Sequence, residues 1–232
     1  MPEPLKAAAL IPTYNNAGTL RDVVERTLKV IPDVLVVDDG STDETSEVLA
    51  SFGPRIRLHR HPQNQGKGRA LRNGFRLLAD AGFTLAIALD SDGQHFPEDL
   101  PRFLEAARAT PNAIIIGDRG MDKAGAPRKS LFGLWFSNRA IRRLTGVALK
   151  DSQCGFRAYP LALVAPLDLR GNRYDLELEV LIRAARAGAG LLQVPVQITY
   201  TPPGGRVSHF RPVRDFLQIA GRLARILLKQ GR

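Results

Sequence analysis

The 232-residue chain is poor in cysteine and in aromatic side chains, and it has no long apolar run. Its one cysteine, Cys154, excludes an internal disulfide framework and fits a reducing compartment. Aromatic residues are only 6% of the chain, too few to interleave with its basic residues as base-stacking platforms, so no nucleic-acid partner is expected. No apolar run approaches the roughly 18 to 20 residues that span a bilayer, and residues 1–4 do not resemble the start of a secretory signal.

Carboxylates are scarce relative to basic residues, because 23 Asp and Glu stand against 33 Lys and Arg, a formal net charge of +10. Such a surplus attracts phosphate-rich ligands, nucleic acid or an acidic membrane, although solubility alone would also explain it. The surplus is uneven: residues 119–143 contain one carboxylate, Asp122, and residues 206–232 also contain one, Asp215. Each basic segment lies beside an amphipathic or apolar stretch, which favours an anionic partner.

The first two-thirds of the chain alternates short apolar runs with segments of helical periodicity. We expect strands over residues 7–11, 34–37, 56–59, 83–89, 113–117 and 194–200. We expect helices over residues 17–30, 41–52 (opened by a capping box at 41–44), 67–81, 99–109, 130–144, 174–187 and 216–229. This order predicts a single α/β domain built on a doubly wound, mostly parallel sheet with flanking helices.

Within that domain we expect a nucleotide-binding part over 1–119, an acceptor-binding part over 120–211 and an amphipathic C-terminal helix over 212–232. The apolar stripe of this last helix is flanked by cations, which suits a helix lying on anionic lipid. A helix docked on its own domain would show the same pattern, so both interpretations stay open.

The segment that follows the predicted strand 83–89 carries two carboxylates, Asp90 and Asp92, and the amide Gln94. If the backbone stays extended, residues two apart point the same way, and the three side chains form an oxygen-only cluster. Such a cluster suits Mg²⁺ or Mn²⁺. An ordinary turn after a strand would have the same composition.

Two other strand ends carry polar residues that meet at the same edge of a parallel sheet. Residues 11–16 leave the first strand and include Tyr14, which can cover a base. Residues 36–41 leave the second strand and include Asp39, which can accept hydrogen bonds from a base or a ribose. Together with Asp90 and Asp92 they predict a nucleotide pocket.

Four motifs, at residues 11–15, 36–43, 64–68 and 90–95, stand in the order and at the approximate spacing of a known family. Together they resemble a family 2 glycosyltransferase of the GT-A fold. The motif at 151–157 is similar to that of dolichol-phosphate mannose synthase and its bacterial polyprenyl-phosphate relatives.

The resemblance implies roles for particular positions. Those that would hold the nucleoside of the donor are Pro12, Tyr14, Val37 and Asp39. We expect Lys67, Ser91 and Arg206 to contribute to donor binding as well. Those that would bind the metal are Asp90, Asp92 and Gln94. Those that would contact donor or acceptor phosphate are Arg119, Arg128 and Ser137. The sequence departs from the family at Asn16, where mannose synthases often carry Glu. It departs again at residues 206–209, where the family has an Arg and a Lys around the serine.

The chemistry of transfer limits which further residues are needed. The leaving diphosphate must be neutralised, which a divalent ion and arginines can do, and an acceptor phosphate needs no general base. If a base exists, Asp151 is the candidate, although a salt-bridge role would suit it as well. The residues expected to be catalytic are thus Asp92, Asp151, Arg119 and Arg128.

Several reactive side chains are expected to be structural. Cys154 is interpreted as a small buried residue, His59 and His61 as surface residues, and Glu179 as a buried structural partner. His95 is expected beside the metal cluster. Lys67 could touch the donor diphosphate, although the glycines around it also suffice to begin a helix.

The expected activity is therefore an inverting transfer of a hexose from GDP-mannose or UDP-glucose to a polyprenyl phosphate. The expected location is cytoplasmic and peripheral, at the inner face of the cell membrane, with a separate membrane-anchoring subunit as a possible partner. The alternatives are a family 2 transferase with a hydroxyl acceptor on a lipid, pigment or polysaccharide, and a non-catalytic nucleotide-sugar or polyanion binding protein.

Overall fold

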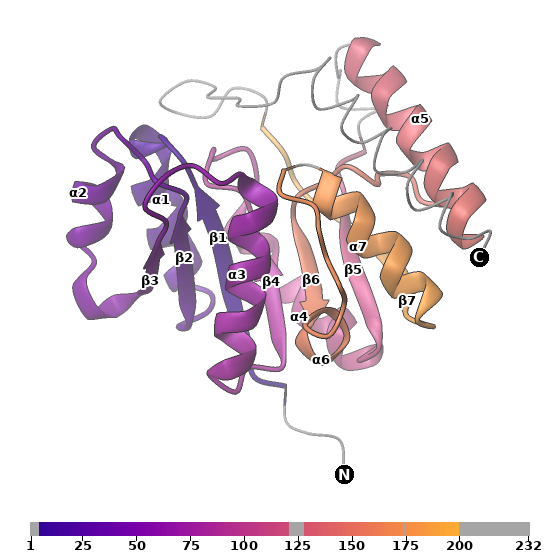
Figure 1. Cartoon of the computed structure of the whole chain (residues 1–232), viewed down its shortest axis with the longest axis horizontal. Helices are drawn as coiled ribbons and strands as arrows, with labels where there is room; N and C mark the ends of the chain where they lie inside the picture. Colours follow the sequence, from indigo (N-terminus) through magenta and orange to yellow (C-terminus); the bar gives the residue numbers. More distant parts are fainter. Residues whose placement is uncertain (1–4, 121–127, 174, 200–232) are drawn as a thin grey trace.

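One seven-stranded sheet forms the centre of the protein (Figure 1), with the strand order β3-β2-β1-β4-β6-β5-β7. The computed structural model describes residues 5–120, 128–173 and 175–199. The strands are β1 (Ala7–Thr13), β2 (Val34–Asp38), β3 (Arg57–Arg60), β4 (Leu85–Ala88), β5 (Ala113–Asp118), β6 (Arg157–Pro160) and β7 (Gly190–Pro195). All neighbours pair in parallel except β6, which is antiparallel to both β4 and β5. The predicted α/β architecture with a mostly parallel sheet is confirmed.

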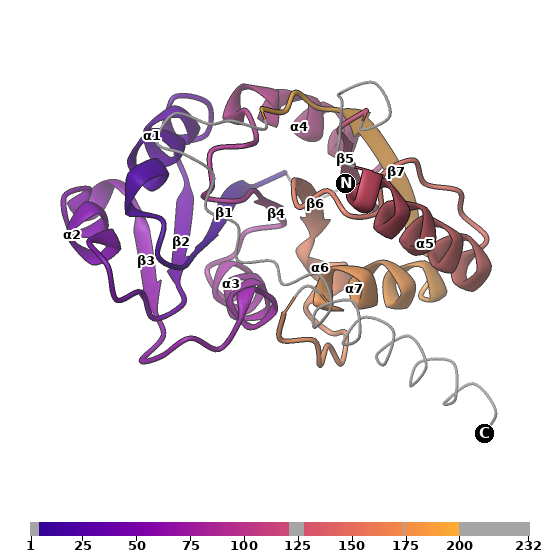
Figure 2. The ribbon, with the colours of Figure 1, turned by 90° about the horizontal axis from the view of Figure 1, so that it is seen from above.

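Helices cover both faces of the sheet. They are α1 (Ala17–Leu28), α2 (Thr45–Ala50), α3 (Lys67–Asp80), α4 (Leu100–Ala109), α5 (Arg128–Thr145), α6 (Leu161–Val164) and α7 (Asp175–Arg186), with 3₁₀ turns η1 (Gly53–Arg55) and η2 (Pro97–Asp99). Figure 2 shows α1 and α4 on one face and α3, α6 and α7 on the other, and α5 packs against α7. Because both faces are covered, β2 and β4 are apolar throughout except for Asp38 and are completely buried.

The structure corrects three of the predicted elements. Strand β6 was missed, because four residues that contain an arginine and end in proline do not show an apolar strand pattern. Strand β7 lies at 190–195 instead of 194–200. Helix α2 begins at Thr45, and the predicted cap Ser41 is used at the end of β2 instead, where its amide donates to Asp38 and its hydroxyl accepts from the amide of Asn15. The C-terminal helix predicted over 212–232 lies outside the described residues.

The order of the strands reverses between β1 and β4, which makes this pair the place where open α/β sheets bind ligands. The two strands pair from Ala7 to Leu10, after which they separate. Pro12 lies beyond that point and is paired in register with Val37 of β2. The amide of Asp39 donates to the carbonyl of Thr13, so the backbone polar groups of Thr13 point toward β2. The backbone groups of the preceding residue, Pro12, point the other way, toward β4. The N–H that proline lacks would therefore have no partner strand at this position. Proline is therefore tolerated in a central strand at the position where β1 is no longer paired with β4.

Candidate active site at the carboxyl edge of the sheet

The residues after β4 form a turn and not an extended strand. Gly93 has φ +72°, and the amide of Gln94 donates to Asp92 Oδ1 over 3.0 Å. The expectation that Asp90, Asp92 and Gln94 alternate along one extended segment is therefore wrong, because the aspartate side chain closes a local turn. The three oxygen-bearing side chains nevertheless stay within one turn at the strand reversal point, and each is partly exposed.

Asp90 forms an ion pair with a lysine of the same chain. Lys67 Nζ lies 2.6 Å from Asp90 Oδ1 and 3.2 Å from Glu177 Oε1, so it bridges the β4 turn and the first turn of α7. Burial alone would raise the pKa of Asp90, but the charge of Lys67, with smaller contributions from His95 and Arg119, holds that pKa below its ordinary value. Asp90 is therefore ionised at neutral pH.

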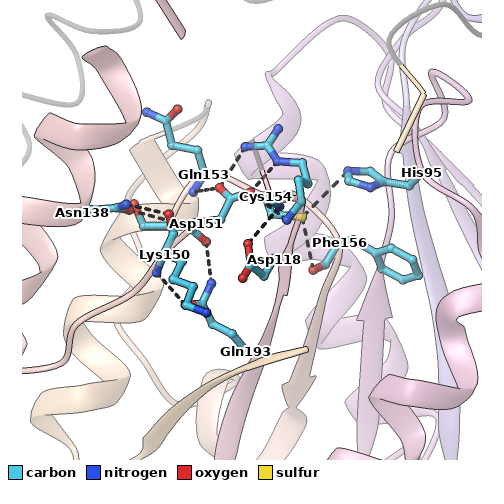
Figure 3. A network of polar contacts seen from close by, with 12 residues as sticks. His95, Asp118, Asn138, Lys150, Asp151, Gln153, Cys154, Phe156 and Gln193 are labelled. Carbon is cyan, nitrogen blue, oxygen red and sulfur yellow. Dashed lines mark hydrogen bonds and ion pairs between the residues drawn. The ribbon is translucent and has the colours of Figure 1, made fainter. Parts of the chain in front are cut away.

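A second ion pair lies at the end of β5. Arg119 Nε donates to Asp151 Oδ2 over 2.6 Å, and Arg119 Nη2 donates to Asp151 Oδ1 over 2.9 Å. Asp151 is 1% exposed, and Figure 3 shows it at the centre of a polar network. Burial would raise the pKa of Asp151, but the hydrogen bonds and charge of Arg119 lower it overall. A buried carboxylate with both oxygens engaged is poorly placed to accept a proton, so the geometry favours the salt-bridge role for Asp151 over the general base.

The loop between α5 and β6, residues 146–156, is fixed from several sides. Arg157 is fully buried and donates to the backbone carbonyls of Cys154, Ser152 and Glu177 over 2.6, 2.8 and 2.7 Å. Asn138 of α5 donates to the carbonyl of Lys150 and accepts from the amide of Ser152. The sequence motif pointed to Arg157 but did not show that its guanidinium holds three backbone carbonyls.

Ser137, predicted to contact acceptor phosphate, is 5% exposed, and Ser152 Oγ lies 3.0 Å from its hydroxyl. It therefore joins α5 to the loop. Arg128 is the first residue of α5, and Arg206 lies outside the described residues. The ligand contacts expected of Ser137, Arg128 and Arg206 stay predictions.

Asp39 organises the segment that precedes α3. Its carboxylate accepts from the amides of Gln65 (2.9 Å) and Gly66 (2.7 Å) and from His61 Nδ1 (2.6 Å). His61 Nε2 lies 2.8 Å from the side-chain amide nitrogen of Asn73, which can only donate, so the imidazole proton is on Nδ1. His61 is 2% exposed, so the prediction of a surface histidine is wrong; its contact with a charged residue distant in sequence gave no local signal.

The end of β1 lies against the β4 turn. Asn16 donates from its side-chain amide to Ser91 Oγ over 2.8 Å, and the hydroxyl of Thr19 donates to the carbonyl of Ser91. Ser91 is 2% exposed, while Tyr14 is partly exposed. Pro12 and Val37 are buried in the strands. Donor contacts of these positions stay predictions, and the structure adds that Asn16 joins the two strand ends.

His95 and Cys154 are buried together below this edge. Their Nε2 and Sγ atoms are 4.0 Å apart, and Figure 3 shows the two side chains facing each other. Burial lowers the pKa of His95 to about 4 and raises the pKa of Cys154 to about 12. The interpretation of Cys154 as a buried structural residue is confirmed. Glu179 is also confirmed as a buried structural partner, because it accepts from the amides of Arg170 and Gly171 and pairs with Arg183.

The residues at the β4 turn fit a divalent cation by their donor chemistry. Asp90, Asp92 and Gln94 offer hard oxygen ligands, which Mg²⁺ and Mn²⁺ prefer. Among the described residues no group of three or more His, Cys, Asp or Glu side chains is placed to hold a metal by itself. A cation at this turn would therefore need oxygens from the Gln94 amide, from water or from substrate.

A family model described as "Glycosyl transferase family 2" matches residues 8–164, more than half of the chain. The chain belongs to glycosyl transferase family 2. The undecaprenyl-phosphate mannosyltransferase of Micrococcus luteus is 31% identical to this glycosyltransferase over 203 residues, which are 83% of each protein. The polyprenol monophosphomannose synthase of Mycolicibacterium smegmatis is 32% identical over 206 residues, 84% of this chain and 77% of that protein. These relatives confirm the predicted resemblance to the polyprenyl-phosphate branch.

Solved structures support the fold of this family 2 glycosyltransferase. Glucosyl-3-phosphoglycerate synthase from Mycobacterium tuberculosis aligns with a TM-score of 0.66 at 20% identity, over 94% of this chain and 78% of that one. Mannosyl-3-phosphoglycerate synthase from Rubrobacter xylanophilus aligns with a TM-score of 0.65 at 21% identity, over 98% of this chain and 75% of that one. The GT-A fold is thereby confirmed. In the part of the chain that the structure describes, no helix has the length and apolar character to cross a membrane.

Proposed function

We propose that this family 2 glycosyltransferase transfers a hexose, with inversion, from GDP-mannose or UDP-glucose to a polyprenyl phosphate. The observation that carries the proposal is the engagement of Asp151 by Arg119 through both carboxylate oxygens. A hydroxyl acceptor needs a base to remove its proton, whereas a phosphate monoester is already an anion. The names of the polyprenyl-phosphate relatives from M. luteus and M. smegmatis support the same acceptor.

The side chains at the β4 and β5 ends have complementary roles in this proposal. Asp90, Asp92 and Gln94 would hold Mg²⁺ or Mn²⁺, which would help to neutralise the leaving diphosphate. Arg119, fixed in direction by Asp151, would bind phosphate with its planar guanidinium. The charge of Arg119 contributes to the lowered pKa of Asp90, so the two sites are electrostatically linked.

We further propose that the enzyme works as a peripheral protein at the inner face of the cell membrane. Helix α5 contains no carboxylate, and its residues Arg139, Arg142 and Arg143 are exposed. Trp135 is 57% exposed, and the guanidinium of Arg139 lies 5.9 Å from its ring centroid. An exposed tryptophan among cations suits the headgroup region of an anionic bilayer. A membrane-anchoring subunit stays part of this proposal.

A transfer assay tests the proposed reaction. GDP-mannose, UDP-glucose and UDP-GlcNAc are each incubated with undecaprenyl phosphate or undecaprenol in detergent, with Mn²⁺ or with EDTA. We expect one donor to glycosylate the phosphate and not the alcohol, and only with the metal. Transfer to the alcohol would favour the hydroxyl-acceptor alternative, and metal-dependent donor binding by calorimetry without any transfer would favour the binding-protein alternative.

A further inference from the structure

The ammonium group of Lys67 lies in a cradle formed by two carboxylates and a glycine. It is 2.6 Å from Asp90 Oδ1 and 3.2 Å from Glu177 Oε1, and the three side chains are 17%, 28% and 9% exposed. A Cβ at Gly155 would stand 3.0 Å from Lys67 Nζ and 2.6 Å from Asp90 Oδ2. The backbone of Gly155 therefore lies against the ion pair on one side, and a side chain at this position would have to displace the carboxylate.

Asp90 is also the carboxylate that the proposed function assigns to a divalent cation, and the present inference rests on that assignment. An ammonium and a divalent cation repel each other strongly at contact distance in a partly buried site, where water screens them little. Both cannot bind the same carboxylate at full strength. We propose that Lys67 is a resident counter-cation of Asp90, which a divalent metal displaces, and that Glu177 receives the displaced ammonium.

Glu177 is well placed to receive it. Its carboxylate already lies 3.2 Å from Lys67 Nζ, and its backbone carbonyl is held by the buried guanidinium of Arg157. Glu177 lies in the first turn of α7, so its backbone position is set by the helix. The affinity of Asp90 for metal then depends on how Lys67 is shared between the two carboxylates. Removing the lysine and removing Glu177 have opposite effects on that affinity.

The test measures Mn²⁺ affinity of the full chain without any sugar donor, by calorimetry or by electron paramagnetic resonance of free Mn²⁺. We expect Lys67→Met to bind Mn²⁺ at least about fivefold more tightly than the natural chain, the lower range of typical coupling between sites. We expect Glu177→Gln to bind it more weakly, because the lysine then pairs with Asp90 alone. The double variant is expected to match Lys67→Met, since Glu177 acts only through the lysine.

The control is Lys29→Met, which removes the same charge from an exposed position at the end of α1. An equal gain in Mn²⁺ affinity in the control would show that the effect comes from net charge alone, and it would overturn the inference. Unchanged affinity in Lys67→Met, or a rise in Glu177→Gln, would overturn it while leaving the metal site standing. If Lys67→Met does not fold, an unchanged affinity in Glu177→Gln overturns the inference. Absence of Mn²⁺ binding in every form would overturn the metal site as well.

Discussion

At the scale of single residues, the site is built from charged side chains whose partners lie far away in the sequence. Lys67 and Glu177 are 110 positions apart, and Arg119 and Asp151 are 32 apart. Arg157 is completely buried and uses its guanidinium on three backbone carbonyls. Burial of such groups is costly unless they are paired, so removing one partner affects the other directly.

The substitution Asp151→Asn tests whether Asp151 positions Arg119. The neutral carboxamide cannot provide two acceptor oxygens for the guanidinium, so we expect kcat/KM to fall by about 10- to 100-fold, which is about 1.4 to 2.7 kcal/mol of transition-state stabilisation. The pH dependence of the remaining activity is expected to keep its shape. The matched control is Asp168→Asn, which breaks the exposed pair with Arg170 and should leave activity unchanged. Loss of the acidic limb of the profile would show instead that Asp151 is a base.

The buried imidazole of His95 is expected to make the stability of the protein depend on pH. Burial lowers its pKa to about 4 from the ordinary 6.5, so the unfolded chain takes up the proton first as pH falls. The neutral imidazole makes its full contribution to the free energy of unfolding above about pH 6.5. This contribution, about 3 kcal/mol in total, is lost as the pH falls from there to pH 4. Asp90 and Asp151, whose pKa values are lowered, lose their contribution only at more acidic pH.

Urea unfolding at several pH values measures this effect. We expect His95→Gln to flatten the slope between pH 6.5 and pH 4. The control is His59→Gln, because His59 is only partly buried and should retain most of the slope. An unchanged slope in His95→Gln would contradict the assignment of this pH dependence to His95.

At the scale of elements, the loop that precedes β6 must approach the β4 turn without a side chain between them. Gly155→Ala would place a Cβ 2.6 Å from Asp90 Oδ2 and 3.0 Å from Lys67 Nζ. We expect this substitution to push the carboxylate aside and to weaken calorimetric binding of the donor with Mn²⁺ by about tenfold, which is about 1.4 kcal/mol.

The matched substitution is Gly18→Ala in α1, where an added Cβ meets nothing within 4 Å. It should leave donor binding unchanged and raise the free energy of unfolding by about 0.5 to 1 kcal/mol, because alanine favours the helix. Equal donor affinity in Gly155→Ala and the natural chain would show that the loop and the turn do not need this close approach.

At the scale of the whole molecule, the net charge of +10 and the basic helix α5 predict attraction to anionic membranes. Trp135→Ser is expected to reduce binding to phosphatidylglycerol vesicles about fivefold or more in a flotation assay, because an exposed indole anchors in the headgroup region. The control Leu58→Ser changes another exposed apolar residue, 48% exposed on β3. Equal loss in both variants, or none in Trp135→Ser, would remove α5 as the contact surface.

The family motifs also form one connected structure at this scale. Asp39, from the motif at 36–43, binds the amides of Gln65 and Gly66 in the motif at 64–68. Lys67 of that motif binds Asp90 in the motif at 90–95, which packs against Gly155 in the motif at 151–157. Motifs separated along the chain therefore stabilise each other's geometry, which gives a physical reason for their joint occurrence.

The alternation of strands and helices, the family and the strand ends that carry the site could all be predicted from the sequence. These depend on apolar periodicity and on short local motifs, which can be read without knowing the contacts. The three-dimensional contacts were needed to show that His61 is buried against Asp39, that Asp151 holds Arg119 and that Lys67 pairs with Asp90. They were also needed to show the antiparallel strand β6, whose short and partly polar sequence is stabilised between two neighbours. The physical reason is that the partner of a buried charge is chosen by packing between distant segments, and no local pattern encodes it.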